Sequence, residues 1–480
     1  MRTMLRRPFH LLAVLALAAC AVNPATGERQ LSLVSESQEI QMGQEYDPQI
    51  VAQMGLYGDS AIQRYVRNIG MRMAAQSERP NLPWTFRVID DPIVNAFAVP
   101  GGFIYVTRGI LAYLDSEAQL AAVVGHEIGH VTARHSVSQM SRAQLAQIGL
   151  VVGSVVSPEI AGVADVAGAG LQVLFLKYGR DDERQSDELG IRYMRRVDYD
   201  IREMPGVFTL LESVSAAQGG GRIPEWLSTH PAPEDRRERI QAIIASLPPD
   251  SLGRIVDRAD YVQQLDGLVF GDDPREGFFR ASEFLHPTLR FRLTFPQGWK
   301  TVNQKQAVIG VSQAQDAVIQ LTLAQQSSAA AAAQAFAGQE GITAGSARRT
   351  TINGLTATTF DFTANTQSGA VSGTCTHIEK DGSVYQILAY GVQARWSSYE
   401  TATRNTAQSF QRLTDANVIN VQPRRVDIVR INSAMTLAQF AQRNPGSATL
   451  DELEMLNQTS RNATIPSGSY VKNVVGQRVQ

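Results

Sequence analysis

The sequence predicts an α+β protein with several domains: a mainly helical domain with a small sheet, an α+β domain, and a small β-α-α-β module. Three observations support this class. Apolar residues at helical spacing dominate up to about residue 255, and alternating runs typical of strands dominate 287–415. In 425–475, two strand-like runs enclose two helix-like runs. A chain of 480 residues is long enough for such a division.

The N-terminus has the pattern of a signal for export. Residues 1–19 begin with a basic stretch, and an apolar run follows from Leu11 to Leu17. That run is too short to span a membrane as a helix. We therefore expect residues 1–19 to be a signal peptide.

The residues LAAC at 17–20 are similar to a bacterial lipobox. This similarity implies that Cys20 is lipidated and becomes the first residue of the mature chain; a plain secretory signal is the alternative. Ala21, and not aspartate, follows the cysteine, which by resemblance to enterobacterial sorting signals implies the outer membrane. The polar residues 20–34 are expected to be a tether, and the protein an outer-membrane lipoprotein that faces the periplasm.

Charge and cysteine content exclude other classes. The formal net charge is −2, so the chain has no single-sign excess of the kind that attracts nucleic acid, and no nucleic-acid partner is expected. Cys375 is the second of two cysteines. With Cys20 lipidated it has no partner in the chain, so we expect a small apolar core residue and no internal disulfide.

The first domain is predicted to cover residues 35–255. Ser35 and Gln38 have the spacing of a capping box at a helix start. Short strand-like runs fill 84–107, and Pro100-Gly101-Gly102 predicts a turn between the last two. Further helices are predicted around 62–73, after Asp115 or Ser116, as a pair within 181–218, and at 233–246.

One segment within this domain and the segment that follows it need separate interpretation. Residues 143–176 are apolar and rich in glycine and alanine, but Pro158, Glu159 and Asp165 interrupt the run, so a membrane span is not favoured. We expect buried or cleft-covering helices there; a surface that touches membrane or client protein is the alternative. Residues 256–286 are expected to be a linker.

The sequence VVGHEIGHVTARH at 123–135 is the strongest chemical signal. His126 and His130 are four residues apart, so on a helix both imidazoles lie on one face and can bind one metal. Glu127 is placed to take a proton from water at that metal. The spacing therefore predicts a zinc-binding helix of the HExxH type.

A third protein ligand must come from elsewhere in the chain. His135 follows one residue too early for the pattern HExxHxxGxxH, and we expect a structural role for it. In KYGRDDERQSDELG, Glu183 and Asp187 share a helical face. One of these carboxylates can bind zinc, and the other can accept a hydrogen bond from a ligand histidine.

Together with STHPAPEDR at 228–236, these motifs resemble the HtpX/BepA-like zinc metallopeptidases, zincins of the gluzincin type related to the CAAX prenyl proteases. The resemblance covers roughly residues 23–245. It implies that Glu183 is the third zinc ligand and that Asp187 orients a ligand from behind. It also implies that His230 is a fourth zinc ligand, or that His230 or Arg236 stabilises the oxyanion as a catalytic residue; a loop histidine is the alternative for His230.

This resemblance implies a zinc-dependent endopeptidase with one Zn²⁺ per chain. Its substrates are expected to be proteins or peptides of the cell envelope, in protein quality control, and Glu127 is the expected general base. The run VNAFAV at 94–99 is expected to pair with substrate backbone; an ordinary core strand is the alternative.

The two C-terminal regions carry weaker resemblances. The start of 287–415, HPTLRFRLTFPQGW, is similar to the PsbP/Mog1-type α+β sandwich, and His286 and His377 there are expected to be structural. Residues 425–475 resemble a LysM domain, which implies peptidoglycan as a further partner. Two other functions stay open: a chaperone or assembly adaptor with a latent protease site, and a cell-wall-binding protein.

Overall fold

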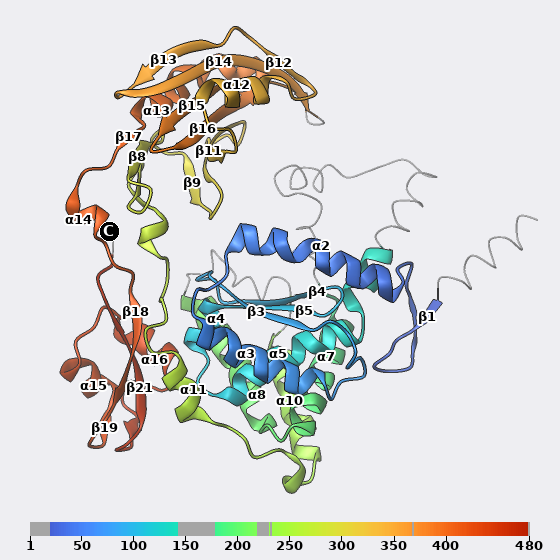
Figure 1. Ribbon diagram of the computed structural model, residues 1–480. Coiled ribbons are helices and arrows are strands. Elements are labelled where there is room, and N and C mark those ends of the chain that lie inside the picture. Colours follow the sequence, from blue (N-terminus) through green and yellow to red (C-terminus); the bar gives the residue numbers. More distant parts are fainter. Residues whose placement is uncertain (1–19, 143–177, 218–229, 231–232, 367–368, 479–480) are drawn as a thin grey trace, which may run out of the picture. The chain divides into compact units, whose positions relative to one another are not determined.

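The computed structural model describes residues 20–142, 178–217, 230, 233–366 and 369–478 (Figure 1). The predicted signal peptide and the apolar segment 143–176 lie outside the described residues. Contacts divide the chain into two units. Unit 1 comprises Met1–Gly271 and Arg424–Gly476, and unit 2 comprises Asp272–Pro423 and Gln477–Gln480.

Unit 1 contains a three-stranded sheet in the order β3-β5-β4, in which β3 is parallel and β4 antiparallel to β5. The strands are β3 (Thr85–Ile89), β4 (Ala96–Val99) and β5 (Phe103–Thr107). The predicted turn Pro100-Gly101-Gly102 joins the last two, with φ of 86° at Gly101 and 96° at Gly102, where glycine is favoured. The sheet lies between α2 on one face and α3 and α5 on the other (Figure 1).

The α-helices of unit 1 before the C-terminal module include α2 (Glu36–Met54), α3 (Ser60–Ala74), α4 (Arg108–Tyr113), α5 (Glu117–Thr132), α7 (Arg180–Arg196), α8 (Met204–Ala217), α10 (Pro233–Ser246) and α11 (Arg258–Gln264), and residues 135–142 are also helical. Strands β1 (Cys20–Val22) and β2 (Arg29–Leu31) form an N-terminal hairpin. The Ser35 capping box and the Ser116 cap of α5 confirm the predicted helix starts.

Helix α5 is the centre of this unit, and nearly every residue of it is buried. It packs closely on α7 because glycines stand at the contact. A Cβ on Gly129 would lie 2.9 Å from the carbonyl oxygen of Ser186, and one on Gly190 would lie 3.2 Å from the backbone nitrogen of His126. Larger side chains at these two glycines would force the helices apart.

A buried ion-pair network fixes α2 to the end of α5. The carboxylate of Glu39 accepts hydrogen bonds from Arg79 and from Arg134, each at 2.9 Å. Arg79 also donates to the carbonyl oxygen of Val131 in the last turn of α5, at 2.9 Å. Arg134, with φ of 58°, lies two residues after the end of α5. These ion pairs replace the water molecules that solvate the same charges in the unfolded chain.

The C-terminal module of unit 1 has the predicted β-α-α-β order. It consists of β18 (Arg425–Arg430), β19 (Met435–Thr436), α15 (Leu437–Arg443), α16 (Leu450–Leu456), β20 (Thr464–Ile465) and β21 (Tyr470–Val475). Strands β18 and β21 pair in antiparallel fashion, and β19 pairs with β20.

A buried lysine fastens this module to the start of the α5 helix. Lys472 of β21 is fully buried. Its ammonium donates to the carbonyl oxygens of Leu114 (2.7 Å) and Ala112 (3.1 Å) at the end of α4. It also lies 3.7 Å from the carboxylate of Asp115, just before α5. Burial lowers the pKa of the Lys472 side chain well below its usual value, and these oxygens offset part of that effect by accepting its N–H groups.

Unit 2 has two sheets and three α-helices among its described residues. The small sheet has the order β17-β8-β7-β6. In the large sheet the order is β12-β14-β15-β16-β11-β10-β9, and β13 also pairs with β14. Apolar residues of both sheets share one core, and a second core beneath α12 contains Cys375.

The strands of unit 2 are β6 (Phe278–Arg280), β7 (Glu283–His286), β8 (Phe291–Thr294), β9 (Lys300–Asn303), β10 (Val308–Val311), β11 (Ala317–Ala324), β12 (Ile342–Ala344), β13 (Arg348–Ile352), β14 (Leu355–Thr366), β15 (Gly369–Lys380), β16 (Ser383–Val392) and β17 (Gln411–Arg412). Its helices are α12 (Ala329–Ala337), α13 (Glu400–Ser409) and α14 (Ala416–Ile419).

These observations confirm the α+β class. Cys375 is free and buried, and burial raises the pKa of its thiol, which fits a small core residue. The segment 256–286 differs from a plain linker, since it contains α11, β6 and β7. Tyr261 of α11 is buried, and its hydroxyl donates to the carbonyl oxygen of Leu111 at 2.7 Å. This helix has seven residues, too few to show helical periodicity.

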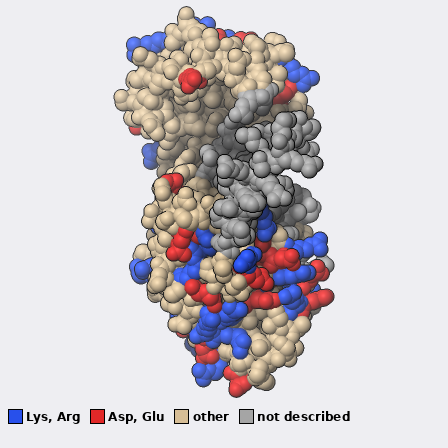
Figure 2. Space-filling model, turned by 90° about the vertical axis from the view of Figure 1, so that its right-hand side faces the viewer, with Lys and Arg blue, Asp and Glu red and all other residues tan. Residues whose placement is uncertain are grey.

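Among the described residues, no helix combines the length and the apolar character that a membrane crossing requires. Acidic and basic side chains are interspersed on the face of unit 1 shown in Figure 2, which agrees with the small net charge.

Replacing Lys472 by methionine tests the attachment of the C-terminal module. Methionine keeps most of the apolar volume but leaves the carbonyl oxygens of Ala112 and Leu114 without their donor. We expect the free energy of unfolding of unit 1 to fall by about 1–3 kcal/mol, measured by urea denaturation. The control, exposed Lys300→Met, should change it by less than about 0.5 kcal/mol. Equal stability of the two variants would contradict the role given to Lys472.

Candidate metal centre

Helix α5 brings the two predicted histidine ligands together. His126 and His130 lie on the same face of the helix, and their Nε2 atoms are 3.0 Å apart. Both side chains are buried. The spacing of four residues thus produces the convergence that it predicts.

Helix α7 supplies the carboxylate. One Glu183 oxygen lies 3.6 Å from Nε2 of His126, and the other lies 3.5 Å from Nε2 of His130. Glu183 sits one turn into α7, whose close packing on α5 at Gly129 and Gly190 determines how near the carboxylate comes.

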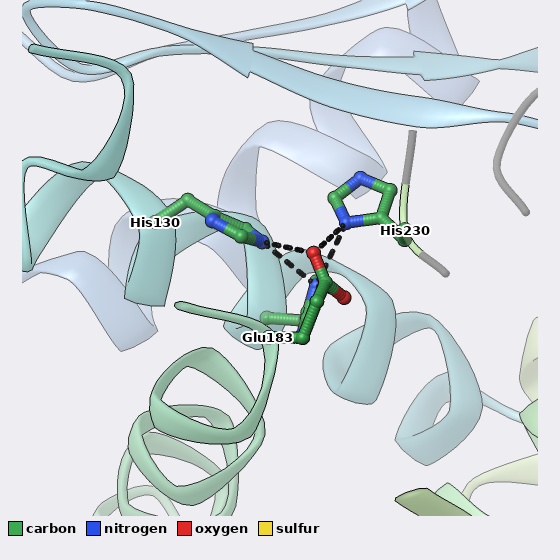
Figure 3. Close-up of side chains that lie close together, drawn as sticks. His130, Glu183 and His230 are labelled. Atoms are coloured by element: carbon green, nitrogen blue, oxygen red, sulfur yellow. Dashed lines mark hydrogen bonds and ion pairs between the residues drawn. The ribbon is translucent and has the colours of Figure 1, made fainter. Parts of the chain in front are cut away.

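His230 completes the cluster from a different part of the chain. Its Nδ1 lies 2.8 Å from a Glu183 oxygen and 3.3 Å from Nε2 of His126. Figure 3 shows the side chains of His130, Glu183 and His230 pointing toward one another. His230 is therefore part of the cluster and not an isolated loop histidine.

The donor set fits zinc. The potential ligand atoms of His126, His130, Glu183 and His230 all lie within 4.8 Å of one another. In a tetrahedral zinc site with bonds of about 2.0–2.1 Å, ligand atoms are roughly 3.3 Å apart. The distances between His126, His130 and Glu183, and from His230 to His126 and Glu183, range from 2.8 Å to 3.6 Å. Three imidazoles and one carboxylate are also ligand types that zinc prefers.

Asp187 orients His126 by a hydrogen bond to the ring nitrogen that faces away from the cluster. One carboxylate oxygen lies 3.0 Å from Nδ1 of His126, so it accepts the Nδ1–H and leaves Nε2 with a lone pair for a metal. Arg236 holds this carboxylate through two hydrogen bonds, at 2.7 Å and 2.8 Å. Burial would raise the pKa of Asp187, but Arg236 and the hydrogen bond from His126 lower it to about 2.

The surroundings of the two helix histidines and of Glu183 keep these side chains in the protonation states that can bind a metal. Burial lowers the pKa of His126 and His130, which keeps them in the neutral form that binds metal. Burial would raise the pKa of Glu183, but His230 and Arg236 lower it and keep the carboxylate ionised. Burial would lower the pKa of His230, but Glu183 beside it raises that pKa.

The predicted base lies beside the cluster. Glu127 is fully buried, and one of its carboxylate oxygens lies 3.7 Å from Nε2 of His230. Arg236 pairs with Glu183 as well as with Asp187, at 2.5 Å and 2.7 Å. All seven residues that the sequence predicts for the site, apart from the lipidation site, therefore surround one point.

Sequence reasoning did not single out Tyr178. Its ring stacks on that of His130, with centroids 3.8 Å apart, and its hydroxyl lies 2.8 Å from Oγ of Ser136. Tyr178 stands just before the α7 helix, in the same run as Glu183, and proximity in sequence to that motif was its only signal. His135 contacts His130 on the side away from the cluster, with the two Nδ1 atoms 2.9 Å apart.

Residues 60–244 match the model of the family described as Peptidase family M48. The matched segment contains the buried cluster of potential metal ligands. Both findings support the predicted metallopeptidase class.

Among curated proteins, the chain is 33% identical over 223 residues to the β-barrel assembly-enhancing protease of Escherichia coli, covering 44% of this chain and 45% of that protein. It is 31% identical over 185 residues to the mitochondrial metalloendopeptidase OMA1 of Arabidopsis thaliana, covering 38% of this chain and 36% of that one. The chain thus spans about half or less of the length of these relatives.

A solution structure of cyanobacterial PsbP from Synechocystis sp. is matched over 28% of this chain and 95% of that chain, with 16% identity and a TM-score of 0.24. A TM-score this low does not support a conclusion about the fold. The resemblance of 287–415 to the PsbP/Mog1-type sandwich stays a prediction.

The Asp187→Asn substitution tests how the cluster is held. Asparagine keeps the shape but removes the charge that pairs with Arg236 and accepts from His126. We expect zinc affinity to fall by about 10- to 100-fold, measured by competition with a chromogenic chelator. Glu188→Gln, at an exposed position of the same helix, is the control and should bind zinc like the wild type. Unchanged affinity of Asp187→Asn would contradict the orienting role.

Proposed function

We propose that the protein is a zinc-dependent endopeptidase that hydrolyses peptide bonds in proteins of the cell envelope. The observation that carries this proposal is the buried cluster of His126, His130 and Glu183 with Glu127 beside it. We assign the two histidines and Glu183 as zinc ligands, Glu127 as general base, and Cys20 as the lipidation site.

The mechanism follows from these positions. Bound zinc supplies a Lewis acid that polarises the scissile carbonyl and lowers the pKa of water. Glu127 takes the proton of the attacking water and passes it to the leaving amine. Asp187 keeps His126 in the tautomer that presents Nε2 to the site.

Arg236 fits a positioning role better than a direct one. Its guanidinium donates to both oxygens of Asp187 and pairs with Glu183, so it already neutralises two buried carboxylates. We therefore propose that Arg236 maintains the ligand set. We propose that His230, whose Nδ1 lies among the potential ligand atoms, holds the site latent; stabilisation of the oxyanion is the alternative role that the His230→Ala variant tests.

Strand β4 is the proposed substrate-binding element. It forms one edge of the described sheet and lies against α5, the helix that carries the histidines. The outer backbone groups of an edge strand can pair with an extended peptide. Pairing along Ala96–Val99 would lay such a peptide beside the metal cluster.

The proposed location is the periplasmic face of the outer membrane, with the chain anchored through a lipid on Cys20. One relative is named for enhancing the assembly of β-barrels. By that similarity we propose outer-membrane proteins as substrates, in quality control of their assembly. Peptidoglycan binding by residues 425–475 also stays a proposal, and retention of the protein on purified peptidoglycan tests it.

A second candidate function is an assembly adaptor with a latent protease site. The position of His230 favours it, because Nδ1 lies among the potential ligand atoms and occupies the place that a substrate or water requires. Full function of a Glu127→Gln variant in cells that lack the wild-type protein would support the adaptor.

The Glu127→Gln substitution tests the peptidase. Glutamine cannot accept the proton, so we expect the cleavage rate of an unfolded outer-membrane β-barrel protein to fall by about 10²- to 10⁴-fold, while zinc content stays the same. Glu340→Gln, at an exposed position in unit 2, is the control. Cleavage at the wild-type rate by zinc-loaded Glu127→Gln would reject the assigned base.

The His230→Ala substitution tests whether His230 keeps the protease site latent. Because His230 lies among the ligand atoms, we expect its removal to raise the cleavage rate several-fold while zinc stays bound. The rate is measured on the same unfolded substrate, with the wild type in parallel. A lower rate than the wild type would show that His230 acts in the reaction and does not block the site.

A further inference from the structure

We propose that Asn23, Gln185 and His135 form a relay of hydrogen bonds that fixes the tautomer of His130, so that its Nε2 presents a lone pair to the metal. The relay links the N-terminal hairpin to the cluster through three side chains. This inference rests on the proposed role of His130 as a zinc ligand.

The relay begins at Asn23, a buried residue of the turn between β1 and β2. Its side-chain oxygen accepts the backbone N–H of Ala25 at 2.9 Å and of Thr26 at 3.3 Å. Backbone donors thereby determine which end of the amide is oxygen. The other end, Nδ2, donates to Oε1 of Gln185 at 3.1 Å.

The orientation of the Asn23 amide in turn determines the orientation of the Gln185 amide. Since Nδ2 of Asn23 can only donate, the Gln185 atom that faces it is the amide oxygen. The same oxygen lies 2.9 Å from Nε2 of His135. An amide oxygen can only accept, so Nε2 of His135 carries the hydrogen.

His135 completes the relay. With the hydrogen on Nε2, its neutral ring has a lone pair on Nδ1. That atom lies 2.9 Å from Nδ1 of His130 and 3.2 Å from the hydroxyl of Ser186, which is able to donate to it. His130 must therefore carry its hydrogen on Nδ1, and its Nε2 is free to face His126 and Glu183.

The two ligand histidines thus have different supports. His126 is oriented by the carboxylate of Asp187, which Arg236 neutralises, whereas His130 is oriented by the neutral imidazole of His135. The far end of the relay lies three residues after Cys20. The hairpin next to the proposed lipid anchor is thereby a supporting part of the metal centre, and His135, Gln185 and Asn23 are positioning residues.

The first test measures the tautomer directly. In the metal-free protein with ¹⁵N-labelled histidine, NMR should show His130 with its hydrogen on Nδ1. The His135→Leu variant removes the acceptor, and His130 should then populate both tautomers. A neutral His130 whose only ring hydrogen is on Nε2 in the wild type, or an unchanged tautomer in His135→Leu, would overturn the relay.

The second test measures zinc affinity with matched pairs of variants. His135→Asn places an acceptor oxygen near the former Nδ1, and Gln185→Glu keeps the acceptor for His135. We expect affinity to fall by about 10- to 100-fold in His135→Leu and Gln185→Leu, but by less than about threefold in the two conservative variants. Equal losses in both members of each pair would mean that the residues only fill space, which overturns the relay.

The two tests separate the relay from the proposed function. The tautomer is measured without metal, so it decides on the relay even if the protein binds no zinc, the result that would reject the peptidase. Circular dichroism checks folding of each variant. Gln185 is only partly buried, so its pair of variants decides the question if His135→Leu does not fold.

Discussion

Glu183, Asp187 and Arg236 carry charges and yet are almost completely removed from water between α5, α7 and α10. Each such ion loses several kcal/mol of hydration, which only well-placed partners recover. The partners are supplied by the fold: glycines bring α5 and α7 together, and Arg236 lies between the two carboxylates. A cation among His126, His130, Glu183 and His230 would satisfy the remaining lone pairs.

The surrounding elements hold the helix that carries the histidines at both ends. At its start, Lys472 of the C-terminal module binds the carbonyl oxygens of Ala112 and Leu114. At its end, Glu39 of α2 accepts from Arg79 and Arg134. The Lys472 contacts join segments about 360 residues apart in the sequence, whereas Glu39 lies 40 and 95 residues from its two arginine partners. The Lys472 contacts help to explain why the C-terminal module belongs to the same compact unit as α5.

Most features that could be predicted from the sequence depend on local patterns. The spacing of four residues in HEIGH and in Glu183–Asp187 depends only on the helical repeat, so the shared faces follow without knowledge of the fold. The meeting of the two helices with His230 came from resemblance. The relay through Asn23 and Gln185, the stacking of Tyr178 and the contact of Lys472 depend on the packing of distant segments, which no local pattern records. Helix α11 was missed because a helix of seven residues is too short to show helical periodicity.

Anomalous diffraction at the zinc edge, from crystals of the protein purified without chelators, tests the central claim most directly. The account predicts a single strong peak in unit 1 within about 2.0–2.2 Å of Nε2 of His126, Nε2 of His130 and a carboxylate oxygen of Glu183. A peak bonded to other residues, or none at this cluster in protein supplied with zinc, would show that the buried charges are balanced without a metal. The proposed peptidase would then lose its basis.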